Sequence, residues 1–414
     1  MSKSVCPAVK STLDAPPALE VADVIRTHGK AFLAQYGRSL SLAQRRAFSA
    51  LAHCRTAALG GHVDECDKCG ARVISYNSCR NRHCPKCQAG RSAAWLERET
   101  KSLLPVDYYH VVFTLPHELG PLALQNPAKV YGLLFQAVAE TLRQIAADPK
   151  HLGAEIGVVA LLHTWGQTLQ HHPHIHCVVT GGGLAVDAAG RREQPARWLS
   201  CRPGFFLPEK GLSELYRGKF LALVRAAYDA GELPCHGRLE ALADPAAFRA
   251  LLQPLYAKGW VVDITGPFAG PENVLKYLAR YVHRVAISNS RLVGMADGQV
   301  TFTWKDYAHG GKQRKMTLPA VEFLRRFLLH VLPKGFVKVR HYGLLANRQR
   351  EEKLALCRCL LTLLGLVMAA VLLAPAATPE VRICPECGEG HLHWVEDLPR
   401  PSAATRVATR RDTS

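Results

Sequence analysis

Cysteine pairs constrain the fold of this chain more than any other feature of its sequence. The 414 residues include 14 cysteines, and three C-x-x-C pairs stand out: Cys66/Cys69, Cys84/Cys87 and Cys384/Cys387. No secretory signal is expected, because residues 1–17 lack a continuous apolar core. Paired thiols in a chain without an export signal predict structural zinc in a reducing cytoplasm, not disulfides.

The first two pairs have the spacing of two zinc knuckles that share one ion. Each knuckle aims two thiolates at a point about 2.3 Å away. We therefore predict one structural zinc ion with these ligands: Cys66, Cys69, Cys84 and Cys87. Further candidates interleave with them and would form a second, cross-braced zinc site: Cys54, His62, Cys79 and His83. The partners of the third pair stay open between two sets: Cys357 with Cys359, or His391 with His393.

The charge balance favours a polyanionic partner. Lys and Arg number 52 against 34 Asp and Glu, so the formal net charge is +18. Nucleic acid is the usual partner of so basic a protein. Arg80 and Arg82 lie among the cysteines, where they are suited to contact a DNA backbone. The apolar run Leu360–Ala377 contains a glycine and a proline, and we predict a buried helix there and no membrane partner.

A strand rich in histidine is the first candidate for catalysis. Alternation along the predicted strand His174–Thr180 places His172, His174 and His176 on one face. The other face is apolar and should point into the core: Ile175, Cys177 and Val179. Two neutral imidazoles at His174 and His176 can chelate one divalent metal ion, with water and phosphate oxygens in the open positions.

A third protein ligand would have to come from nearby polar residues. The candidates are Gln167, Gln170, His172 and His163. The competing interpretation is that the histidines are a surface feature, or that they form a zinc site of another kind.

Two tyrosines form the second catalytic candidate. Tyr277 and Tyr281 are four residues apart in a predicted helix, Glu272–Val285, so they share one helix face. They could instead belong to the apolar stripe of that helix and lie in the core. A basic row beside them favours DNA: Lys276, Arg280 and Arg284. A phenol that attacks a metal-polarised phosphate would give a 5′-phosphotyrosine and a free 3′-OH, and rejoining would need no ATP.

The arrangement of predicted elements is α+β. Strands at Tyr109–Leu115, Val158–Trp165 and His174–Thr180 surround a long helix, Leu122–Ile145, and the glycines 181–183 should end the last of these strands. The second and third strands are close enough in sequence to be antiparallel neighbours, which excludes a Rossmann-type sheet.

We expect three regions along the chain. Residues 20–98 should form a helical and zinc-binding domain for DNA recognition, and residues 105–345 the catalytic domain. Residues 346–414 should hold a C-terminal helix, a zinc knuckle and a disordered basic tail.

Several motifs together resemble a known family. HVVFTLPHEL (110–119), LLHTWGQTLQHHPHIHCVVTGGG (161–183) and YLARYVHR (277–284) resemble the successive motifs of HUH endonucleases. With the upstream CRTAALGGHVDECDKCG and NSCRNRHCPKCQ, they resemble the two-tyrosine rolling-circle transposases of the insertion-sequence-91 family, over residues 20–350.

The resemblance implies an HUH-type antiparallel sheet with flanking helices, preceded by a small helical and zinc-binding domain. It implies Mg²⁺ or Mn²⁺ at His174 and His176, and nucleophiles at Tyr277 and Tyr281. The expected activity is cutting and rejoining of single-stranded DNA at element ends and targets, in the bacterial cytoplasm at the nucleoid. Two alternatives stay open: a plasmid or phage replication initiator, and a non-catalytic zinc-binding regulator. The sequence does not indicate the oligomeric state.

Overall fold

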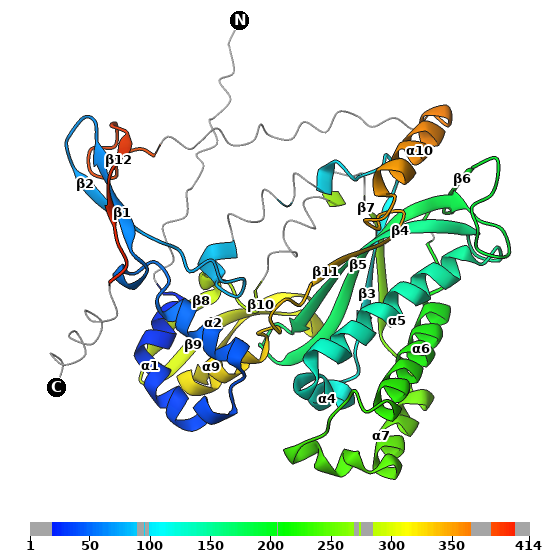
Figure 1. The fold of residues 1–414 in the computed structure, drawn as a ribbon, viewed down its shortest axis with the longest axis horizontal. Helices are drawn as coiled ribbons and strands as arrows, with labels where there is room; N and C mark the ends of the chain where they lie inside the picture. The colour runs from blue at the N-terminus through cyan, green and yellow to red at the C-terminus, as the bar shows by residue number, and fades with distance from the viewer. Residues whose placement is uncertain are drawn as a thin grey trace, which may run out of the picture.

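The computed structural model describes residues 19–88, 95, 99–204, 206–268, 273–274, 285–365 and 382–401. Its strands form three sheets, with the orders β11-β4-β5-β3-β7, β10-β9-β8 and β12-β1-β2, while β6 pairs with β5. Every strand pair is antiparallel. The predicted α+β class and antiparallel sheet are therefore confirmed (Figure 1).

The largest sheet carries the histidines. Its strands are β3 (Tyr108–Thr114), β4 (Ala154–Trp165), β5 (His171–Ala185), β6 (Trp198–Ser200), β7 (Val262–Phe268) and β11 (Val339–Gly343). Helices cover one of its faces: α4 (Gly120–Gln125), α5 (Pro127–Ala147), α6 (Glu209–Asp229) and α7 (Pro245–Ala257). Ile175, Cys177 and Val179 are fully buried in the core on this side, as the alternation predicted.

Two local predictions about this sheet and its helices were wrong. The helix predicted at Leu122–Ile145 is two helices, because the helical conformation is interrupted at Asn126 and α5 begins at Pro127. The glycines 181–183 continue β5 and do not end it. A Cβ at Gly183 would lie 2.1 Å from the carbonyl oxygen of Glu155, so glycine is what allows the neighbouring strand to approach.

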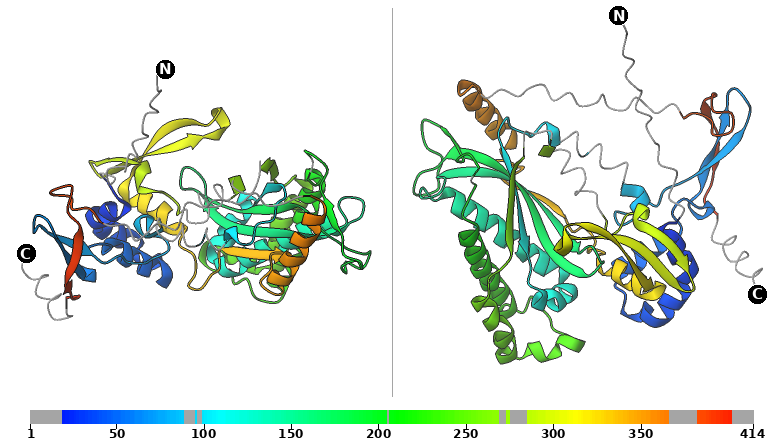
Figure 2. Two further views of the ribbon diagram at one scale, coloured as in Figure 1. Left: turned by 90° about the horizontal axis from the view of Figure 1, so that it is seen from above. Right: turned by 180° about the vertical axis from the view of Figure 1, so that it is seen from behind.

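The N-terminal helices pack on the second sheet. They are α1 (Val21–Tyr36) and α2 (Leu42–Ala52), and their partners are β8 (Leu292–Ala296), β9 (Gln299–Asp306), β10 (Lys312–Pro319) and α9 (Ala320–Leu329). Ser41 is the N-cap of α2, and its side chain forms a reciprocal capping box with Gln44. The β9–β10 hairpin projects from the body of the molecule (Figure 2, left).

The two described parts of residues 346–401 lie in different places. Helix α10 (Arg350–Leu363) packs on the large sheet through Leu354, Cys357 and Leu361. Strand β12 (Leu392–Leu398) instead joins β1 (Gly61–Cys66) and β2 (Arg72–Tyr76) in the third sheet.

Only the start of the apolar run Leu360–Ala377 is described. There Leu361 is buried, whereas Leu363 and Leu364 are exposed. Among the described residues, no helix is both long and apolar enough to cross a membrane.

Candidate functional site

Three histidines meet on the face of the large sheet opposite helices α4 to α7. His174 and His176 come from β5, and His163 of β4 lies directly opposite His174 in the strand pairing. One potential ligand atom from each imidazole lies within 4.8 Å of the other two. We call His163, His174 and His176 the histidine trio. The alternation of strand residues, which buries their neighbours, is what turns all three imidazoles toward the same side.

Hydrogen bonds orient the two β5 imidazoles. Nδ1 of His174 lies 2.7 Å from the carbonyl oxygen of His172, so Nδ1 carries the proton and Nε2 keeps its lone pair. Nδ1 of His176 lies 2.9 Å from Nε2 of His110 on β3. If His176 donates this bond, its Nε2 is also free to bind a metal. Desolvation lowers the pKa of His174 and of His110 to about 4, which keeps both rings neutral.

The structure favours His163 as the third ligand among the four candidates. Trp165 stacks on the His163 ring, with centroids 4.5 Å apart, and so fixes its orientation. Gln167 is directed to β9, where its side-chain oxygen lies 3.5 Å from the backbone nitrogen of Lys305. His172 is exposed and lies outside the trio. His110 was missed in the sequence because its role becomes visible only once β3 and β5 are paired.

The predicted nucleophiles and the basic row lie outside the described residues: Tyr277, Tyr281, Lys276, Arg280 and Arg284. The structure does describe a residue on each side of this segment. Val274 is fully buried in the same core cluster as Leu161, the residue opposite His176 on β4. Ala286 lines a small cavity together with Trp165, which stacks on His163. One flank of the segment therefore belongs to the core cluster on the histidine face of the sheet, and the other shares a cavity with a residue of β4.

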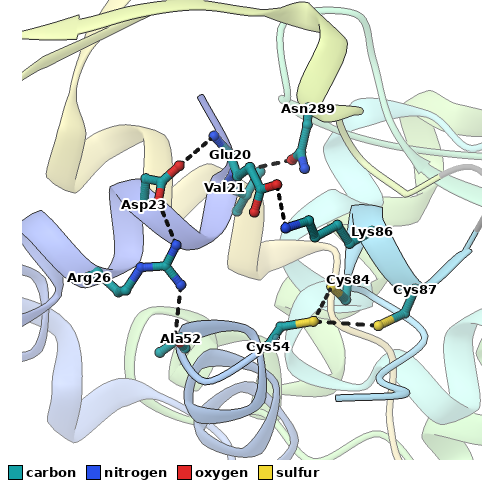
Figure 3. A network of polar contacts seen from close by, with 10 residues as sticks. All are labelled: Glu20, Val21, Asp23, Arg26, Ala52, Cys54, Cys84, Lys86, Cys87 and Asn289. Carbon is teal, nitrogen blue, oxygen red and sulfur yellow. Dashed lines mark hydrogen bonds and ion pairs between the residues drawn. The ribbon is translucent and has the colours of Figure 1, made fainter. Parts of the chain in front are cut away.

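A first group of four cysteines lies beside helices α1 and α2. It consists of Cys54, Cys79, Cys84 and Cys87. The Sγ atom of Cys54 lies 3.6 Å from those of Cys84 and Cys87 (Figure 3). A tetrahedral zinc site with bonds of about 2.3 Å has sulfur–sulfur edges of about 3.8 Å, so the thiols fit one zinc ion. Hydrogen bonds from Cys79 and Cys84 hold the pKa of Cys54 well below its ordinary range, which favours a thiolate.

A second group of four cysteines joins a segment near the N-terminus to a segment near the C-terminus. It consists of Cys66, Cys69, Cys384 and Cys387. The Sγ atoms of Cys66 and Cys387 are 3.7 Å apart, as are those of Cys69 and Cys384. These separations again match the edges of a zinc-thiolate tetrahedron and far exceed a disulfide bond of about 2.05 Å.

The predicted sharing of cysteines between the two sites was therefore wrong. Cys66 and Cys69 lie at the tip of the β1–β2 hairpin, while Cys54 and Cys79 flank its base. A strand rises about 3.3 Å per residue, so cysteines at the tip and at the base of the hairpin are too far apart to bind the same ion. His62 and His83 belong to neither group: His62 lies 3.4 Å from Asp64, and His83 lines the small cavity beside Trp165. Burial lowers the pKa of His83 to about 3.

The third cysteine pair has different partners from those considered in the sequence. Cys357 is buried against the large sheet in α10, and Cys359 is exposed. His391 and His393 contact Asp67 instead of the thiols. One sequence signal could have found the pairing. The first and third pairs are each followed by glycine (Gly70 and Gly388), whereas Cys87 is followed by Gln88.

The two arginines assigned to DNA are placed differently. Arg80 is exposed beside the first cysteine group. Arg82 donates to the carbonyl oxygens of Phe336 and Pro333, so its guanidinium ties the cysteine loop to the large domain.

Comparison with known proteins identifies the family. A family model described as "Putative transposase" matches residues 157–353, and a "Transposase zinc-binding domain" model matches residues 24–115. The "Putative transposase y4qJ" of Sinorhizobium fredii is 53% identical over 392 residues, which covers 91% of this chain and 95% of the relative. The transposase for insertion sequence element IS801 of Pseudomonas savastanoi pv. phaseolicola is 29% identical over 304 residues, 71% of this chain and 68% of the relative.

No solved structure matches the chain. The zinc-binding model covers the first cysteine group and half of the second, and the transposase model covers the whole histidine trio. The two cysteine groups thus support structural zinc, and the protein is one that processes DNA. On the strength of the nearly full-length relative and the two domain models, this chain belongs to the insertion-sequence-91 family of transposases.

Proposed function

We propose that this transposase cuts one DNA strand at the ends of its element, with Tyr277 or Tyr281 as the nucleophile and a divalent ion at the histidine trio. The observation behind the proposal is the convergence of three imidazoles on one sheet face, with Val274 in the core cluster of that face and Ala286 sharing a cavity with Trp165. A purely structural role for these strands does not need three imidazoles turned toward one point on the same sheet face.

The trio fits a catalytic metal ion. His174 and His176 would bind it through Nε2, since Nδ1 of each already has a hydrogen-bond partner, and His163 would complete a three-nitrogen set. Three protein ligands leave positions for water and phosphate oxygens, unlike the closed four-thiol groups. Nitrogen donors are softer than the oxygen ligands that Mg²⁺ prefers. We therefore expect Mn²⁺ to support cleavage at lower concentrations than Mg²⁺.

The proposed reaction is a transesterification at phosphorus. When bound, the ion would withdraw charge from the scissile phosphate. The phenol of Tyr277 loses its proton and its oxygen bonds to phosphorus, while the bond from phosphorus to the 3′-oxygen breaks. The 3′-oxygen takes up a proton and leaves as a 3′-OH. The 5′-phosphotyrosine that remains is itself a phosphate diester, so the reverse reaction rejoins DNA without ATP.

Two tyrosines would allow two cut ends to be held at once, which a rolling-circle exchange requires. Lys276, Arg280 and Arg284 would neutralise phosphates of the strand beside them. We assign recognition of the element ends to the zinc-binding domain, where Arg80 is exposed beside the first cysteine group. The name of the IS801 relative, an insertion-sequence transposase, agrees with this role.

The test is to incubate the protein with single-stranded DNA from the element ends and Mn²⁺. A covalent protein–DNA adduct should form, His174→Ala should abolish it, and either Tyr277→Phe or Tyr281→Phe should weaken strand transfer. His117→Ala and Tyr256→Phe are matched controls, since both side chains are exposed and lie outside the trio and its flanks. They should leave the adduct unchanged.

Two other outcomes would redirect the proposal. If the protein binds end DNA but forms no adduct with any metal ion, it is a DNA-binding regulator and not a strand transferase. If it cuts only a replication origin and never joins an end to a new target, it acts as a replication initiator.

A further inference from the structure

The third sheet is assembled from segments at opposite ends of the chain. Its central strand β1 pairs with β2 on one side and with β12 on the other, from Gly61 opposite Leu398 to Cys66 opposite Leu392. Figure 1 shows β12, in red, beside the blue β1 and β2. We call residues 61–76 and 382–398 together the ribbon. The zinc-binding family model ends at residue 115 and so includes only the first half of it.

The two cysteine pairs of the ribbon are built alike. In each, the glycine after the second cysteine donates its N–H to the carbonyl of the first cysteine: Gly70 to Cys66 at 3.0 Å, and Gly388 to Cys384 at 2.9 Å. Both glycines have φ of +72°, a conformation that strongly favours glycine. Two turns of one geometry thus face each other and present four thiols to a common point.

Backbone groups lock the two turns together. The N–H of Asp67 donates to the carbonyl of His391 at 3.0 Å, and the N–H of His391 donates to the Asp67 carboxylate at 2.7 Å. The N–H of Gly390 lies 3.3 Å from the sulfur of Cys387. A Cβ at Gly390 would lie only 2.2 Å from the sulfur of Cys66, so the close approach of the two chain ends depends on glycine there.

The ribbon has little hydrophobic core to hold it together. None of its described residues belongs to the three core clusters found in the described part of the chain. A fully buried carboxylate, Asp64, sits at its centre and pairs with Arg382 at 2.8 Å and with Ser75 at 3.1 Å. A small sheet of this kind needs another source of stability, and a structural metal ion supplies it in many small domains.

We propose that a zinc ion bound by Cys66, Cys69, Cys384 and Cys387 closes a split zinc ribbon, and that residues 382–398 are thereby part of the N-terminal zinc-binding domain. The catalytic domain is inserted between the two halves of this ribbon. The ribbon carries seven acidic side chains against three basic ones, which makes it a poor surface for contact with DNA phosphates.

Zinc content and thiol protection test the proposal on the full-length protein. The double variant Cys384→Ser with Cys387→Ser should bind one zinc ion fewer per chain than the unaltered protein. Cys66 and Cys69 should then become open to alkylation in the folded protein, although they lie more than 300 residues away in sequence. The thiols of the first cysteine group should stay protected. Cys359→Ser, an exposed cysteine outside both groups, is the control and should change neither measurement.

Gly390→Ala is a milder variant that retains all four ligands. It should lose zinc to a competing chelator at least 10-fold faster than the unaltered protein, whereas Gly259→Ala, which has open space around its Cβ position, should not. The proposal is overturned if zinc content and the protection of Cys66 and Cys69 are the same with and without the C-terminal cysteines. Oxidation of the four thiols to disulfides in the freshly isolated protein would also overturn it.

Discussion

Each of the two cysteine groups presents four thiols, but the two groups lie in different surroundings. Cys54 and Cys84 belong to a hydrophobic core with α1, α9 and the second sheet, and basic residues flank them in the sequence. The second group lies in the acidic ribbon, outside the described core clusters. Zinc at the first group therefore reinforces a packed domain, while zinc at the second replaces packing. The first group is the better candidate for contact with DNA, and the second for holding residues 382–398 against β1.

Zinc removal should show the largest difference between the groups. Structural zinc sites contribute about 10 kcal/mol or more to the folding of small domains. We expect a strong chelator to reduce amide protection in β12 and β1 by at least about 100-fold, and in α1 and α2 much less. Hydrogen exchange measured residue by residue checks this. Equal loss of protection in both regions would mean that the core around Cys54 also depends on metal.

Single substitutions in the two cysteine groups should also differ in their effect on stability. Cys84→Ser places a hydroxyl in a packed core and removes a ligand, so we expect a loss of global stability of about 3 kcal/mol. Cys384→Ser should leave the main unfolding transition in place and affect only the ribbon. Chemical denaturation followed by tryptophan fluorescence measures the first effect, and limited proteolysis near residue 390 the second. If Cys384→Ser also shifts the main transition, the ribbon is coupled to the core.

A smaller effect should follow from Arg382→Ala. This change leaves the buried Asp64 with Ser75 and His62 as its side-chain partners, and without the arginine. Because the arginine is half exposed, we expect a cost of about 1–2 kcal/mol to the ribbon alone. Zinc retention against a chelator should fall about 10-fold. Unchanged retention would mean that the metal and backbone hold the ribbon without this ion pair.

The smallest effects should appear in DNA binding. Arg80→Ala removes an exposed cation beside the first group, and we expect a loss of a few-fold in affinity for end DNA with a salt dependence reduced by about one phosphate contact. Arg72→Ala in the ribbon is the matched variant, because Arg72 already pairs with Glu65 and Glu396. It should leave affinity unchanged. Equal losses of affinity for both variants would mean that the ribbon contacts DNA as well.

Sequence patterns predicted the features that depend on neighbouring residues. The alternation in β5 placed the imidazoles on one face and Ile175 in the core, and the capping box of α2 joins residues only three apart, Ser41 and Gln44. These follow from strand and helix geometry, in which each side chain's direction is set by its position in the element.

Features that depend on distant segments were harder to predict. The partnership of Cys66 with Cys387 joins positions 321 residues apart, and no local periodicity specifies it. His163 could be preferred over Gln167 only once β4 and β5 had a register. The continuation of β5 through Gly183 likewise reflects the close approach of Glu155 on another strand. In each case tertiary contacts decided among choices that the local sequence left open.

The most direct test of the proposed mechanism is to map the residue that becomes attached to DNA. Single-stranded end DNA is cleaved in Mn²⁺, the covalent complex is digested with a protease, and the nucleotide-bearing peptide is sequenced by mass spectrometry. We expect a 5′-phosphate linked to Tyr277 or Tyr281, and loss of the adduct in His174→Ala. Attachment to any other residue, or cleavage without a covalent intermediate, would contradict the proposed mechanism.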